Sequence, residues 1–62
     1  MIKVTKAGRE ITSGKCFAYF DNGQFEVSHD EMLRINFKIQ CGETYEVTRE
    51  WFDAFDGVKY EY

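Results

Sequence analysis

Hydrophobic and polar residues alternate along most of the chain, a pattern typical of β-strands that bury one face. We predict strands in the segments with the clearest alternation, which are residues 2–6 (IKVTK), 15–20 (KCFAYF), 36–40 (NFKIQ), 44–47 (TYEV) and 58–62 (VKYEY). Turn residues between the first two segments place a turn near Ala7-Gly8 or Ser13-Gly14. The pattern therefore indicates a chain rich in short strands.

The segment Asp21-Asn22-Gly23 predicts a β-hairpin after the strand at 15–20. Asparagine and glycine tolerate the positive φ angles that a type I′ turn requires. With Asn22-Gly23 as the turn, the opposed pairs are Phe20 with Phe25, Ala18 with Val27, and Tyr19 with Glu26. The inner face then holds Cys16, Ala18, Phe20, Phe25 and Val27, and the outer face holds Phe17, Tyr19 and Glu26.

Two short helices are predicted by capping residues. Ser28 precedes Glu31 by three positions, which fits a capping box, and the apolar side that follows is Met32, Leu33 and Ile35. Thr48 caps a second helical turn that extends to Asp56 and ends at Gly57. Within it an apolar arc of roughly 160° opposes a charged side. The arc consists of Trp51, Phe52, Ala54 and Phe55, of which we expect Trp51 to stay partly exposed.

The 62 residues therefore predict one domain of the α+β class, rich in β-structure. We expect a small curved antiparallel sheet, or an OB-like barrel, of about five strands with one or two short helices. A chain this short has a small core, and eleven aromatic residues (six Phe, four Tyr, one Trp) compensate for that. The predicted core is Val4, Cys16, Ala18, Phe20, Phe25, Val27, Leu33, Ile39 and Phe55.

Three segments in order resemble the cold-shock family, which has the OB fold. The run KCFAYF is similar to that family's Lys-Gly-Phe-Gly-Phe strand, with Phe17 and Tyr19 at its outward aromatic positions. FEVSHDEM resembles the next strand and turn, and KIQCGETYEV resembles the Leu-x-x-Gly-x-x-Val-x-Phe strand. The resemblance covers about two-thirds of the chain in order and spacing, and it implies a barrel that stacks single-stranded bases on its outward aromatics.

The net charge of −3 is unevenly distributed, because residues 1–15 carry +3 (Lys3, Lys6, Arg9 and Lys15 against Glu10) and residues 16–62 carry −6.

No segment is long and apolar enough to span a bilayer, and the N-terminus lacks the apolar run of a signal peptide. We therefore expect a cytoplasmic protein with reduced cysteines and no membrane partner. Cys16 and Cys41 are interpreted as small buried hydrophobic residues and His29 as a partly buried packing residue, without a metal or cofactor.

No catalytic motif is present, so we expect a protein that is not an enzyme. The first hypothesis is a non-catalytic protein-binding module. It would act as an inhibitor or accessory factor, of the kind that phage and other mobile-element genomes encode, on a partner with a basic surface. Its contact residues would be Phe17, Tyr19, Glu26, Glu50, Trp51 and Asp53.

The alternative is a single-stranded nucleic-acid-binding OB-like protein. It would use Lys3, Lys6, Lys15, Phe17, Tyr19 and Lys38.

Overall fold

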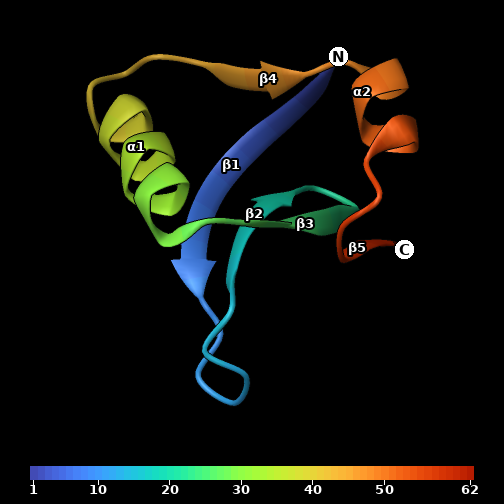
Figure 1. Cartoon of the computed structure of the whole chain (residues 1–62). Coiled ribbons are helices and arrows are strands. Elements are labelled where there is room, and N and C mark those ends of the chain that lie inside the picture. The colour runs from blue at the N-terminus through green and yellow to red at the C-terminus, as the bar shows by residue number, and fades with distance from the viewer.

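Five antiparallel strands form one sheet, and two helices pack on the same side of it (Figure 1). The computed structural model describes all 62 residues. Its elements in chain order are β1 (Ile2–Arg9), β2 (Cys16–Phe20), β3 (Gly23–Val27), α1 (His29–Gln40), β4 (Tyr45–Val47), α2 (Arg49–Ala54) and β5 (Lys59–Glu61). Strands hold 39% of the residues and helices 29%, which confirms a β-rich α+β fold.

The sheet is open. Its strand order is β4-β1-β2-β3-β5, so the short strands β4 and β5 are the two edges and do not pair with each other. Of the two forms expected from the sequence, the chain adopts the open antiparallel sheet. The longest strand, β1, continues past the predicted residues 2–6 to Arg9 and carries an irregularity between Val4 and Lys6. The turn to β2 lies at the second of the two predicted places, where Gly14 has a φ of 75°.

The β2–β3 hairpin forms, but its turn differs from the predicted one. Gly23 pairs with Phe20 and Phe25 with Ala18, so the connecting residues are Asp21 and Asn22. No residue of this turn has a positive φ, and the type I′ prediction is therefore wrong. Glycine is needed at position 23 for space, because a Cβ there would overlap the backbone oxygen of Tyr60 and the ring of Phe20.

The predicted faces of the hairpin survive this change of turn. Each residue of β3 faces a residue of β2 two positions from the predicted one, and a shift of two residues keeps every side chain on its own face. Cys16, Ala18, Phe20 and Phe25 are accordingly buried in the core as expected.

Helix α1 is longer than predicted. Ser28 is its N-cap, and the Ser28 hydroxyl accepts a hydrogen bond from the backbone N–H of Glu31 (3.1 Å), which confirms the cap. The helix then continues to Gln40, so the strand predicted at 36–40 is wrong. Met32, Ile35 and Ile39 follow the helical period and pack on the sheet, and this period outweighs the short alternation that indicated a strand.

Helix α2 begins at its predicted cap, because the Thr48 hydroxyl accepts a hydrogen bond from the N–H of Trp51 (3.0 Å). It ends at Ala54, earlier than predicted. Its C-cap is Phe55, so the prediction that Gly57 closes the helix is wrong, and Gly57 has no positive φ. The ring of Phe55 occupies the space that a Cβ at position 57 would need.

The core lies between the sheet and the two helices. Of the predicted core residues, five are buried and three (Val27, Ile39 and Phe55) are partly buried against them. Leu33 is the exception, with 54% of its surface exposed, because α1 turns it away from the sheet. The predicted core omitted four buried residues: Ala7, and also Met32, Ile35 and Phe52, which the sequence had placed on the apolar sides of the two helices.

Candidate functional site

The six predicted protein-contact residues lie on two different parts of the molecule. Phe17, Tyr19 and Glu26 lie on the face of the sheet that no helix covers, which we call the helix-free face. The other three, Glu50, Trp51 and Asp53, lie on α2. The structure therefore does not unite these six residues into one surface.

On the helix-free face, Phe17 is buried. Only 2% of its surface is exposed, because the rings of Tyr19 and Tyr60 flank it at centroid distances of 6.3 and 6.4 Å. The prediction that Phe17 is an accessible contact residue is therefore wrong. Tyr60 is 52% exposed and was not among the predicted contact residues. Its alternation with Lys59 and Glu61 along the last strand could have indicated that it lies on the opposite face from them.

The lysines of the alternative nucleic-acid site do not form a continuous stripe. Lys6 lies over the ring of Tyr19 (5.4 Å from its Nζ to the ring centroid), and the Nζ of Lys15 is 4.0 Å from a carboxylate oxygen of Glu26. Lys3 faces Glu46 across the β1–β4 pair. Acids thus interrupt the basic residues of this face. Lys38 is on α1, on the other side of the sheet from Tyr19.

On α2, Trp51 combines exposure with a fixed position. Its ring stacks on that of Phe55 (5.2 Å between centroids, 24° between planes) and contacts the ring of Phe25 edge-on (5.2 Å, 67°). In the next position, Phe52 is buried and meets Phe20 edge-on at 5.3 Å, which anchors the helix to the sheet. Trp51 nevertheless leaves 43% of its surface exposed, so the prediction of partial exposure is confirmed.

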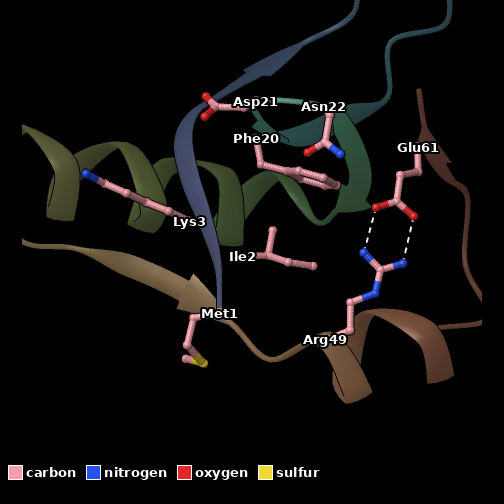
Figure 2. A pocket seen from close by; sticks show the side chains of 8 residues that line it. All are labelled: Met1, Ile2, Lys3, Phe20, Asp21, Asn22, Arg49 and Glu61. Carbon is pink, nitrogen blue, oxygen red and sulfur yellow. Dashed lines mark hydrogen bonds and ion pairs between the residues drawn. The ribbon is translucent and has the colours of Figure 1, made fainter.

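Asp53 is engaged within the molecule. Its carboxylate is 3.0 Å from a guanidinium nitrogen of Arg49, and Arg49 also donates two hydrogen bonds to Glu61, of 2.6 and 2.7 Å. Figure 2 shows this paired contact between α2 and β5. The hydrogen bonds to Glu61 and Asp53 raise the pKa of Arg49, and the hydrogen bonds from Arg49 lower the pKa of Glu61. Asp53 is therefore not a free acid for a partner.

An open depression of about 240 Å³ lies beside this ion pair. Its lining includes Phe20, Asp21 and Asn22 of the hairpin and Ile2 of β1 (Figure 2). In the figure, Arg49 and Glu61 point toward each other at one side, and the ends of Lys3 and Met1 point away from them. Arg49 binds the carboxylate of Asp53 on its own helix and that of Glu61 on β5, so its guanidinium stabilises the contact between α2 and β5.

Glu50 and Asp56 are exposed, and neither carboxylate takes part in an ion pair. Two acids on or just after α2 are therefore exposed and unpaired, namely Glu50, a predicted contact residue, and Asp56, which was not among the predicted contact residues. Asp56 was visible in the sequence as one of the acids opposite the aromatic arc.

The cysteines and the histidine occupy separate places. Cys16 is buried in the core as predicted, and both thiols are free. Cys41 follows α1 and is exposed, and His29 begins α1 and is also exposed, so the predictions of a buried Cys41 and a partly buried His29 are wrong. No three or more His, Cys, Asp or Glu side chains lie close enough together to hold a metal ion.

Further apolar side chains are exposed on α1 and at the β1–β2 turn. Leu33 and Phe37, four positions apart on α1, are 54% and 65% exposed, and Ile11 is 97% exposed. None of the helices is long and apolar enough to cross a membrane.

The chain matches no protein-family model, no curated protein and no solved structure.

Proposed function

We propose that the chain is a non-catalytic module that binds another protein through the surface of α2 around Trp51. A rigid, partly exposed aromatic ring makes an effective interface anchor, because little conformational entropy is lost when it binds. The observation that carries the proposal is the fixed position of Trp51 between Phe55 and Phe25 with 43% of its surface exposed.

The charges around this surface support a basic partner. Glu50 and Asp56 are exposed and unpaired, so they are available to a cationic surface. Such charges favour association with a protein of opposite charge and increase the rate of encounter. The role would be that of a cytoplasmic inhibitor or accessory factor, encoded by a phage or another mobile element.

Capture from the lysate of the cells that express the protein tests this function. The immobilised full chain would be compared with Trp51→Ala and with Glu50→Lys, which changes the charge and leaves the packing of Trp51 in place. The matched controls are Tyr62→Ala, another exposed aromatic, and Glu46→Lys, an exposed acid on β4. Melting temperatures would establish that each variant is folded.

We expect proteins that both controls retain to be lost from Trp51→Ala and Glu50→Lys. Trp51 is the one tryptophan of the chain, so its fluorescence reports directly on binding of any purified partner. Equal capture by the folded Trp51→Ala variant and the wild type would contradict the proposal.

The second candidate is binding of single-stranded nucleic acid on the helix-free face. Its support is the exposed or half-buried tyrosines of that face, Tyr19, Tyr60 and Tyr62, together with Lys6, which lies over the ring of Tyr19. A labelled oligonucleotide tests it by fluorescence anisotropy, with Tyr60→Ala as the variant and Phe37→Ala on α1 as the control. Binding that weakens steeply with salt and depends on Tyr60 would support this candidate.

A further inference from the structure

Trp51 differs from the other aromatic residues of this chain in its relation to cations. Lys6 lies 5.4 Å from the ring centroid of Tyr19, and Arg49 and Lys59 lie 5.5 and 5.1 Å from that of Phe52. No cation of the chain lies over Trp51, although the indole ring attracts cations more strongly than the rings of tyrosine and phenylalanine. The strongest cation-binding ring of the molecule is therefore unoccupied.

Helix geometry shows which residues lie beside Trp51 on the side away from Phe55. Phe55 covers one face of Trp51. Because successive helical residues are rotated by about 100°, Ala54 lies on the side of Trp51 opposite Phe55, and Glu50 lies next to Ala54, one turn earlier. Ala54 and Glu50 are both exposed. Trp51, Ala54 and Glu50 therefore lie side by side on the exposed surface of α2, with only the methyl group of Ala54 between the other two side chains, and we call this surface the Trp51 slot.

We propose that the Trp51 slot binds an arginine side chain of the partner protein. A guanidinium group stacks flat on an indole ring and donates hydrogen bonds from its edge, here to the carboxylate of Glu50. A lysine ammonium is a compact, strongly hydrated charge and cannot make both contacts in this planar way. The Glu50 carboxylate and the flat indole ring together therefore select arginine over lysine.

This inference rests on the proposed function, because it names the group that the Trp51 surface would recognise. A tri-arginine peptide is the probe, with tri-lysine as the comparison and a peptide of three citrullines as the uncharged control of nearly the same shape. Each peptide would be titrated into the full chain while the emission of Trp51 is followed. We expect saturable changes with tri-arginine, with an affinity about 3-fold above that of tri-lysine, and no change with citrulline.

Two substitutions test the slot without disturbing the core. Ala54→Leu keeps the helix and the charge but puts a large side chain between Trp51 and Glu50, so we expect tri-arginine binding to weaken about 5-fold or more. Glu50→Gln removes the carboxylate and should weaken binding about 3-fold. The matched control is Glu46→Gln, which makes the same change of charge on β4 and should leave the affinity within about 1.5-fold of wild type.

Equal effects of Glu50→Gln and Glu46→Gln would mean general attraction between charges, and the inference would then be wrong. It would also be wrong if Ala54→Leu bound tri-arginine as well as the wild type does. If Trp51→Ala abolishes capture of a partner while tri-arginine behaves like tri-lysine, the arginine inference is overturned and the proposed function stands. If Trp51→Ala captures the same proteins as the wild type, the proposed function itself is overturned.

Discussion

Replacing Phe17 by alanine tests the most consequential difference between the sequence pattern and the fold. Phe17 lies on the helix-free face, where the alternation of β2 predicts an exposed contact residue, yet only 2% of its surface is exposed. Truncation of a buried phenylalanine costs roughly 3–5 kcal/mol. We expect the lower end, about 3 kcal/mol, because Tyr19 and Tyr60 can move into the vacated space.

This loss is large for a chain of this size. At roughly 0.05–0.15 kcal/mol per residue, 62 residues give a total stability of roughly 3–9 kcal/mol. The unfolding entropy of such a chain implies a change in melting temperature of about 8 °C per kcal/mol, so Phe17→Ala should lower it by roughly 20 °C. Urea denaturation followed by circular dichroism would give the free energy directly.

The matched control is Phe37→Ala, the same substitution at a site that is 65% exposed on α1. We expect Phe37→Ala to change the free energy of unfolding by less than about 1 kcal/mol. Equal losses at the two positions would refute the assigned burial. A loss below about 1 kcal/mol for Phe17→Ala, together with weaker binding of a partner, would restore Phe17 as a contact residue.

Three other predictions address the turn, a helix cap and an ion pair. Gly23→Ala should destabilise the chain by about 2 kcal/mol or more, because its Cβ would overlap Tyr60 and Phe20. The control Gly8→Ala, whose Cβ would lie 4.0 Å from its nearest neighbour, should be tolerated, and thermal unfolding of both variants checks this. Ser28→Ala should cost about 1 kcal/mol in urea denaturation and Ser28→Asp close to none, since aspartate also caps helices; equal losses would count against the cap. Because the Arg49 hydrogen bonds lower the pKa of Glu61 below 4.5, stability from this pair is present above pH 4.5 and is lost as the pH falls through the folded-state value. Glu61→Gln should therefore flatten the acid limb of the stability profile.

Local sequence signals determined the caps and most strands. Ser28 and Thr48 cap their helices because the hydroxyl of each reaches an amide only three residues away, so no distant part of the fold is needed. The inner face of the β2–β3 hairpin was also predictable, since side chains alternate strictly along a strand. That alternation placed Ala18 and Phe25 in the core even though the predicted turn was wrong.

Tertiary structure decided the features that depend on residues distant in sequence. The segment 36–40 alternates like a strand, but Ile39 packs on the core as a continuation of the α1 face, and the Asn36 side chain accepts a hydrogen bond from the amide of Ala7 (3.1 Å). Phe17 is buried because Tyr60, which is 43 positions further along the chain, comes to lie beside it.

The candidate site also combines features that the sequence predicts locally with features that only the tertiary structure decides. The apolar arc of α2 already marked Trp51 as partly exposed, because helical spacing is a local property. Its separation from Tyr19 and Glu26, and the pairing of Asp53 with Arg49 while Glu50 stays unpaired, follow from where α2 meets β5 and the sheet. Periodicity specifies which side of its own strand or helix a residue occupies, but the packing of those elements on one another determines which residues share a surface.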